Sequence, residues 1–417
     1  MSNITQNKGW IVTMAGLGIN LALGILYTWS IFKGKIINSI ETGGDFQWNM
    51  ASVNDPYAVC CLVFAFSMIL AGRVQDIFGP KITALIGGVL VGVGIIWISQ
   101  TTDYLSWVLG FGVLAGMGIG FGYASATPPA LKWFPASKTG LIAGLVVSGF
   151  GLASVYIAPL ATYLIGVWGL QSTMKFFGIA FLIVVVVLAL LLTNPPAGYT
   201  PEGVSKTSAK KQKGKQAAAD NNFNAAYMLK QPAFWILWII YFIGAGAGLM
   251  VIGSVAGMAK KSMGEQAFLV VATMAMGNAG GRVVAGILSD KIGRRLTLAL
   301  MLGFQAVLMF LAIPVVGAEQ SSAFLLVLLS ALIGFNYGTN LSLFPSFSKD
   351  LWGLKSFGVN YGILFTAWGV GGFVLSRLSQ MIQAATDSFT LSFVVADILL
   401  IVGVALTFTI HRQPKKV

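Results

Sequence analysis

A single arginine, Arg282, lies in the middle of the apolar, glycine-rich stretch MGNAGGRVVAGILSD, residues 276–290. A guanidinium is charged at every physiological pH, and its planar fork of N–H donors matches a carboxylate at two points. In a helix, Asn278 lies four residues earlier on the same face and can accept a hydrogen bond from the guanidinium. No acidic residue occupies either neighbouring helical turn, so the counter-ion of Arg282 must come from elsewhere.

Two sources of that counter-ion remain open. It is either the carboxylate of a bound substrate, which we favour, or an acidic side chain of a distant helix such as Asp55. Asp55 stands in MASVNDPYAVCC and has two interpretations of its own. Asn54 or Asp55 can cap a helix that Pro56 begins, or Asp55 is a buried carboxylate that carries a proton.

Aromatic residues with polar groups lie in several of the apolar runs. A tyrosine or tryptophan in an apolar environment needs a partner for its hydroxyl or indole N–H. Each of them alone is more often a packing contact than a ligand. Together with one phenylalanine they are candidates for the wall of a cavity, Tyr361 being the weakest: Tyr27, Tyr123, Tyr337, Tyr361, Phe365 and Trp368.

The whole chain indicates which elements position these residues. Of its 417 residues, 56% are hydrophobic and 9% are charged, whereas soluble domains carry about 25% charged residues. Twelve apolar runs are long enough to cross a hydrocarbon layer of about 30 Å as helices. They are residues 10–32, 49–72, 82–100, 105–128, 140–166, 172–193, 233–257, 266–288, 296–316, 322–345, 358–381 and 388–410. We therefore expect an all-α polytopic membrane protein with twelve transmembrane helices.

These runs fix the expected depth of the charges. Arg282 would lie about 12 Å inside the inner end of the eighth helix, and Asp55 about a third of the way along the second helix from outside. Asp397, in VVADILL, would lie in the middle of the twelfth helix. The adjacent Cys60 and Cys61 point in different directions on one helix, so we expect packing residues and no disulfide.

The net charge of +13 reports topology and not a nucleic-acid partner. If the N-terminus is inside, nineteen of the 26 lysines and arginines fall on inner segments, six fall on outer loops, and Arg282 is the last. Lysines and arginines are retained on the cytoplasmic side of membrane proteins. Both termini are therefore predicted to be cytoplasmic.

The chain divides into two similar halves. Its longest polar stretch, residues 194–231, is rich in Pro, Gly, Ser and Lys and is expected to be a cytoplasmic linker. The segments GRVQDIFGPK and GILSDKIGRR both fit G-x-x-x-D-x-x-G-x-[KR], with Asp76 and Asp290 lying 214 residues apart. Phe134-Pro135 and Phe344-Pro345 repeat at nearly the same offset. We expect an internal duplication, with halves at 1–193 and 232–417 that enclose a site between them.

With these paired loops and the six-plus-six layout, nearly the whole chain resembles the major facilitator superfamily. The resemblance implies that the two loops act as gating latches, with Asp76, Arg73, Asp290 and Arg294 as structural switches. A loop ion pair or a helix cap is the plainer interpretation of each aspartate, and it is compatible with that role. Because twelfth helices of this superfamily pack peripherally, we expect a structural hydrogen bond for Asp397.

Shorter motifs resemble two related families. Asn278 and Arg282 are similar to the D-x-x-x-R of helix 8 in proton-coupled monocarboxylate transporters. YTWSIF, LFPS and NYG resemble the bacterial oxalate/formate antiporters, whose helix-8 arginine matches Arg282. The oxalate exchanger holds the second carboxylate with a lysine in helix 11, where this chain has Trp368. One deep cation suits one carboxylate, since a second would be left unpaired in a dry site.

Other chemistries find little support. The single histidine, His411, lies in the C-terminal tail, no Walker A sequence is present, and the glycines of residues 116–122 lie inside an apolar run and not after a strand. We expect no enzyme, no cofactor and no metal. The sequence predicts a symporter that moves a small monocarboxylate, such as L-lactate or pyruvate, with a proton by alternating access. It would act as a monomer in the bacterial cytoplasmic (inner) membrane, and the alternative is an anion exchanger of the oxalate/formate type.

Overall fold

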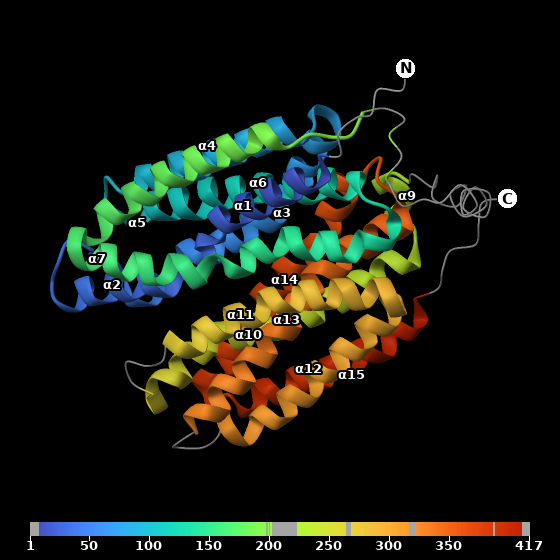
Figure 1. Ribbon diagram of the computed structural model, residues 1–417. Coiled ribbons are helices and arrows are strands. Elements are labelled where there is room, and N and C mark those ends of the chain that lie inside the picture. The colour runs from blue at the N-terminus through green and yellow to red at the C-terminus, as the bar shows by residue number, and fades with distance from the viewer. Residues whose placement is uncertain are drawn as a thin grey trace.

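Helices account for almost all of the regular structure in this protein. The computed structural model describes residues 8–196, 199, 201, 223–263, 268–316, 322–386 and 388–410. His411 and the cluster of lysines between residues 206 and 215 lie outside the described residues. The helices form two groups that lie side by side, one coloured blue to green and the other yellow to red (Figure 1).

The first group holds the N-terminal elements. Its first and fourth membrane crossings are each assembled from more than one element, with a short 3₁₀ or π segment joined to α-helix. The elements are α1 (Gly9–Leu23), η1 (Gly24–Thr28), α2 (Trp29–Glu41), η2 (Met50–Ser52), α3 (Asp55–Phe78), α4 (Pro80–Ile98), α5 (Tyr104–Trp107), η3 (Val108–Ala115), α6 (Gly116–Trp133), η4 (Ala136–Lys138) and α7 (Thr139–Leu191).

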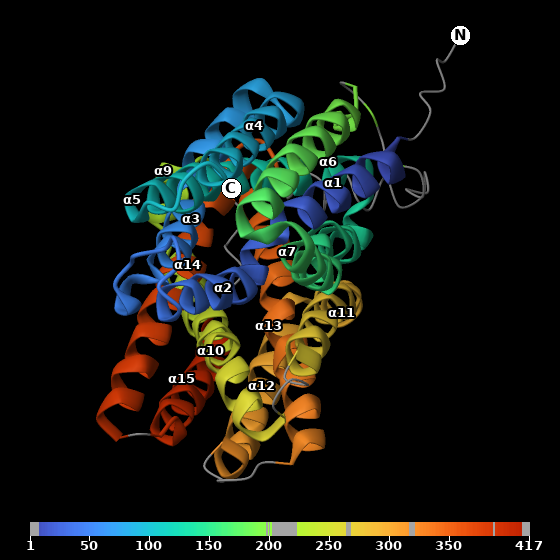
Figure 2. The same cartoon turned by 90° about the vertical axis from the view of Figure 1, so that its left-hand side faces the viewer.

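The second group holds the C-terminal elements. A short helix, α9, leads into six long ones, and Figure 2 shows the two groups from a second side. The elements are α9 (Ala225–Leu229), α10 (Pro232–Met263), α11 (Phe268–Ile292), α12 (Arg294–Val316), α13 (Ala323–Trp352), α14 (Phe357–Thr386) and α15 (Thr390–Thr409).

The predicted twelve crossings are confirmed. Eleven of the described helices are long and apolar enough to span a membrane. One of these, α7, has 53 residues and contains Gly169 with φ +80°, a backbone conformation that favours glycine. A straight helix of that length would measure about 80 Å, so α7 turns back at Gly169 and supplies the fifth and sixth crossings.

The second crossing begins later than its apolar run, and this corrects the predicted depth of Asp55. Helix α3 begins at Asp55, with Pro56 in its first turn, because proline lacks the N–H that a helix interior requires but is tolerated at a helix start. Asp55 therefore lies at the first residue of the helix, and the expectation of a carboxylate a third of the way along the span was wrong. Asn54 occupies the capping position without a side-chain cap hydrogen bond.

Two helix seams join the two groups, α3 with α14 and α7 with α11. At both seams glycines allow the backbones to meet. A Cβ added at Gly72 would lie 2.1 Å from the carbonyl oxygen of Gly358, and one added at Gly140 would lie 2.2 Å from that of Gly286. Any larger residue at these positions would force the helices apart. We call the end of the bundle that carries these glycines the basic end. Four cations lie at the helix ends there, next to the α3–α4 turn, the start of α7 and the α11–α12 turn: Lys81, Lys138, Lys291 and Arg295.

Asp76 ties the first seam at the basic end. Its carboxylate accepts hydrogen bonds from the backbone N–H groups of Gly358, at 3.0 Å, and Val359, at 3.1 Å. These residues lie in the first turn of α14, where N–H groups lack partners within the helix and the helix dipole favours a negative charge. Arg73, which we expected in the same gate, is exposed, and no ion pair to it is seen among the described residues.

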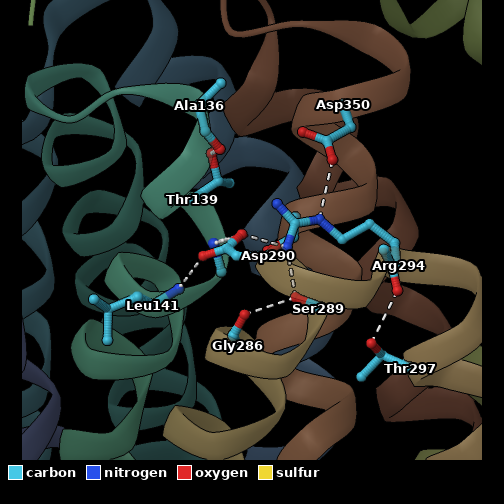
Figure 3. Close-up of polar contacts among 12 residues, drawn as sticks. Ala136, Thr139, Leu141, Gly286, Ser289, Asp290, Arg294, Thr297 and Asp350 are labelled. Carbon is cyan, nitrogen blue, oxygen red and sulfur yellow. Dashed lines mark hydrogen bonds and ion pairs between the residues drawn. The ribbon is translucent and has the colours of Figure 1, made fainter. Parts of the chain in front are cut away.

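Asp290 ties the second seam in the same way. It accepts from the N–H groups of Gly140, at 2.9 Å, and Leu141, at 3.0 Å, in the first turn of α7 (Figure 3). Arg294 adds an ion pair to Asp290 at 2.6 Å and a second one to Asp350 at 3.0 Å. The carboxylates of Asp76 and Asp290 thus each bind the start of a helix from the opposite group, and the basic end is closed.

The latch at Asp290 can be tested by opening it. Asp290→Asn removes the negative charge that two N–H groups and Arg294 share, and a hydrogen bond to a charged group contributes about 1.5–3 kcal/mol. With Cys60 and Cys61 replaced by alanine, a cysteine at Leu141 should then react with a maleimide about 10-fold faster in detergent. Asp350→Asn is the matched control, because the ion pair of Asp350 with Arg294 lies within its own group, and it should change the rate less than two-fold. Equal rates in the two variants would contradict the latch.

Candidate functional site

Arg282 lies on α11 at the seam with α7, and its side chain is 0% exposed. Its Nε donates to Oδ1 of Asn278 at 2.9 Å, as the four-residue spacing predicts. Its Nη1 donates to the backbone carbonyl of Val147 on α7. Its Nη2 has no hydrogen-bond partner among the described residues. Two of the three guanidinium nitrogens therefore have neutral partners and the third has none among the described residues, although the positive charge is fully buried.

No carboxylate neutralises this charge within the described part of the chain. The ion pairs that the described residues form belong to Arg294. Asp55 forms no ion pair with Arg282 and instead accepts a hydrogen bond from the Tyr104 hydroxyl at 2.7 Å. Asp397 is partly exposed on α15, and the hydrogen bond that we expected for it is not seen among the described residues.

A further glycine seam, between α11 and α13 of the C-terminal group, fixes the position of Arg282 within that group. Along α11 and α13 the backbones approach so closely that a Cβ at Gly281 would lie 1.8 Å from the Phe335 carbonyl oxygen. A Cβ at Gly338 would lie 2.0 Å from the carbonyl oxygen of Asn278 and 2.9 Å from its Oδ1. The glycines thus hold the Arg282 and Asn278 pair at a fixed distance from Tyr337, which is the neighbour of Gly338 on α13.

A chain of hydrogen bonds crosses between the groups beside Arg282. The hydroxyls of Tyr27, in η1, and Tyr337 lie 2.8 Å apart, and the indole Nε1 of Trp368, on α14, donates to the Tyr337 hydroxyl at 2.8 Å. Tyr27 belongs to the N-terminal group and the other two to the C-terminal group. The hydroxyls of Tyr27 and Tyr337 lie within electrostatic range of the Arg282 guanidinium, so this chain lies beside it.

Aromatic rings from both groups form the remaining wall. Phe64, on α3, lies 5.2 Å from Phe365 and 5.3 Å from Trp368, measured between ring centroids. Tyr123, on α6, lies 5.5 Å from Phe365, and Tyr27 packs against Phe150 at 5.1 Å. The structure therefore brings together all six aromatic residues named from the sequence, with Tyr361 in contact with Phe365 at 5.8 Å.

Several polar groups in this wall lack a well-formed hydrogen bond to a described residue. The hydroxyls of Tyr123, Tyr241 and Tyr361 make none of acceptable distance and angle, although the Tyr361 hydroxyl lies close enough to the other two for weak contacts with them. Buried hydroxyls and guanidinium groups are normally paired. A small molecule with carboxylate oxygens at one end and an apolar tail would pair with these donors and fit the aromatic wall.

Some members of this site were missed by the sequence reasoning. Phe150 could have been found, because it lies 218 residues before Trp368, the same offset that relates Gly140 to Gly358 on the matching helices. Phe64 and Tyr241 carry no such signal, and the Val147 carbonyl is invisible in any sequence. Asn54, named with Asp55, lies near the other end of the bundle, where it accepts from the Trp29 indole at 3.2 Å.

A hollow that lies away from Arg282 among the described residues does not suit an anion. It has a volume of about 650 Å³ and lies on the loops at the end opposite the basic end. The one charged side chain in its lining is Asp45, which repels a carboxylate. The Arg282 site is the better candidate for an anionic ligand, since it combines a buried cation with unpaired donors.

Several known transporters are similar to this chain in sequence. An oxalate:formate antiporter of Oxalobacter formigenes is 28% identical over 421 residues, covering 100% of this chain and 94% of the antiporter. An uncharacterised transporter of Escherichia coli, YhjX, is 28% identical over 372 residues, covering 88% of this chain and 86% of its own. Human monocarboxylate transporter 11 is 25% identical, covering 95% of this chain and 81% of the transporter.

The fold is also similar to that of solved transporters. The proton:xylose symporter XylE superposes with a TM-score of 0.76 at 14% sequence identity, covering 96% of this chain and 95% of the symporter. At that identity the likeness speaks for the fold alone. The sequence model of the major facilitator superfamily matches residues 9–376. This chain is therefore a member of the major facilitator superfamily of membrane transporters.

Proposed function

We propose that the protein is a proton-coupled symporter of small monocarboxylates, such as L-lactate or pyruvate, and that Arg282 binds the carboxylate. The observation that carries this proposal is the fully buried guanidinium without an acidic partner in the described chain. An uncompensated buried charge is strongly destabilising, at several kcal/mol. A substrate carboxylate that pairs with Arg282 would remove this penalty. Binding of substrate would therefore stabilise the folded site.

The number of buried cations supports a single carboxylate. Arg282 is the only lysine or arginine in the buried class among the described residues. The wall on the α14 side is formed by Trp368 and Phe365, stacked at 5.1 Å, and these rings suit a short apolar tail. A second carboxylate placed there would lose its hydration without gaining a charged partner.

The basic end supports an orientation. Lysines and arginines favour the cytoplasmic side, so we infer that the latches of Asp76 and Asp290 close the cytoplasmic side and that both termini lie there. The membrane would be the bacterial cytoplasmic membrane, and the two six-helix halves, joined by the linker of residues 194–231, would form the site within one monomer. With the basic end closed, substrate would enter from the opposite side.

Exchange of anions is the second candidate, since the oxalate:formate antiporter matches the chain from end to end. An exchanger would move its substrate only against a second anion on the far side. A symporter would accumulate its substrate when a proton gradient is the sole driving force. The two functions share the Arg282 site and differ in how the empty carrier behaves.

The first test is uptake of labelled L-lactate into proteoliposomes with an inward proton gradient. Arg282→Ala should raise the KM by about 100-fold or more, because two charge-assisted hydrogen bonds are lost at about 1.5–3 kcal/mol each. Arg282→Lys keeps the charge but loses the planar fork of donors, and its KM should lie between those of the wild type and Arg282→Ala. Arg377→Ala, which removes an exposed arginine of α14, is the control and should leave uptake unchanged. Uptake by Arg282→Ala at the wild-type KM would refute the binding role.

The same vesicles separate the two candidates. Lactate that enters only when formate or oxalate has been loaded inside, with no effect of the proton gradient, would establish exchange in place of symport.

Trp368→Lys tests why one carboxylate is preferred. A second cation on α14, opposite Arg282, would pair with the far carboxylate of oxalate, so oxalate should inhibit lactate uptake about 10-fold more strongly than in the wild type. Trp368→Met removes the same ring and adds no charge, and it should not gain this inhibition. Equal oxalate inhibition in the two variants would show that charge at this position does not set the preference.

Asp55 remains the candidate that carries the proton. It lies part-buried at the start of α3, with the Tyr104 hydroxyl as its partner. Asp55→Asn should abolish accumulation driven by a pH gradient while lactate–lactate counterflow continues, because counterflow needs no net proton movement. Asp45→Asn changes an exposed loop carboxylate and serves as the control. Full gradient-driven accumulation by Asp55→Asn would exclude it as the proton carrier.

A further inference from the structure

The contact between Arg282 and Val147 is a bond between the two halves of the carrier. Arg282 belongs to α11 of the C-terminal half, and the carbonyl that accepts from its Nη1 belongs to α7 of the N-terminal half. Val147 lies seven residues after Gly140, so its carbonyl is about 10 Å deeper than the Asp290 latch on the same pair of helices. The substrate-binding arginine is thus itself part of the closure of the basic end.

Helix α7 is shaped to receive this arginine. A Cβ added at Gly144 would lie 2.3 Å from the carbonyl oxygen of Arg282, and one added at Gly151 would lie 3.3 Å from its Nε. Val147 lies between these two glycines, about one turn from each. The guanidinium therefore reaches the carbonyl through a slot to which both glycines contribute: Gly144 lets the α11 backbone approach, and Gly151 leaves room beside Nε.

The strength of this bond depends on whether the arginine is neutralised. A hydrogen bond from a charged donor is roughly twice as strong as one between neutral groups. In the empty site the charge of Arg282 is uncompensated, so its attraction for the Val147 carbonyl is at its greatest. A carboxylate bound through Nη2 and Nη1 would neutralise the charge and compete for the Nη1 donor that now binds Val147.

We propose that Arg282 acts as an occupancy sensor, which locks the empty carrier closed on the cytoplasmic side through Val147 and releases that lock when a substrate carboxylate binds. This inference rests on the proposed function, because it assigns the same guanidinium to the substrate. It gives the empty carrier a defined resting state with the basic end shut. It also limits leakage, since the inner gate opens readily only when the site is loaded.

The lock is tested by measuring the opening of the basic end directly. Spin labels on cysteines at Ser137 and Lys291, both exposed and on opposite halves, report the distance between the start of α7 and the end of α11 in detergent or nanodiscs. Cys60 and Cys61 are replaced by alanine. The distance distribution is recorded without anion and with L-lactate, pyruvate, formate or oxalate.

The wild type should show one short distance when empty and a longer one in addition when an anion is present. Arg282→Met should show the longer distance without any anion, with a ratio of open to closed forms raised about 10- to 100-fold. Gly151→Ala keeps the arginine but narrows its slot, and it should shift the empty carrier in the same direction. Gly166→Ala, whose added Cβ would meet nothing within 4 Å, is the matched control on α7 and should not shift it.

Each contrary result has a distinct meaning. Size-exclusion chromatography first checks that both variants are folded. If Arg282→Met and Gly151→Ala without anion then stay as closed as the wild type, the lock is refuted. If anions open Arg282→Met as they open the wild type, the sensor is refuted as well. If the variants open but none of the four anions affects the wild type, the lock stands and the proposed substrate class fails.

Discussion

The structure depends on one uncompensated positive charge held away from water. Arg282 is fully buried, its contacts are the Asn278 amide and the Val147 carbonyl, and neither carries the negative charge that a guanidinium attracts most strongly. A soluble protein rarely keeps an arginine in this condition, because burial is expensive unless the charge is paired. In a carrier the same expense is useful, since the missing partner can be the molecule that is carried.

Such a charge is retained only in a frame that does not relax around it. Glycines bring α11 within backbone contact of α13 on one side and of α7 on the other, so Arg282 cannot turn toward solvent when it is empty. The latches of Asp76 and Asp290 hold the frame shut at one end through helix N-termini of the opposite half. Close packing thus converts a local electrostatic penalty into a preference between whole conformations.

Sequence reasoning succeeded where the signal was periodic or repeated. The twelve crossings, the paired loops and the Asn278–Arg282 hydrogen bond follow from apolar run length, an internal offset and helical spacing. The expected depth of Asp55 was wrong, because an apolar run does not show where a helix begins; of the two interpretations of this segment, the helix that Pro56 begins is the one that the structure shows. Phe64 and Val147 could not have been named, since their roles depend on contacts between helices that are far apart in the chain, and a backbone carbonyl has no identity in a sequence.

The internal repeat shows how the two halves differ at the position of Arg282. The residue that matches Arg282, 214 positions earlier, is Met68, and the two occupy equivalent seams: a Cβ at Gly362 would lie 2.4 Å from the Met68 carbonyl oxygen, as one at Gly144 lies 2.3 Å from that of Arg282. The latches and glycine seams are kept in both halves, whereas the charge is present in one. Gating needs symmetry, because either half must close against the other. In the proposed function, recognition of an anion needs the symmetry broken, and Arg282 in place of a second methionine would break it at the seam where the halves meet.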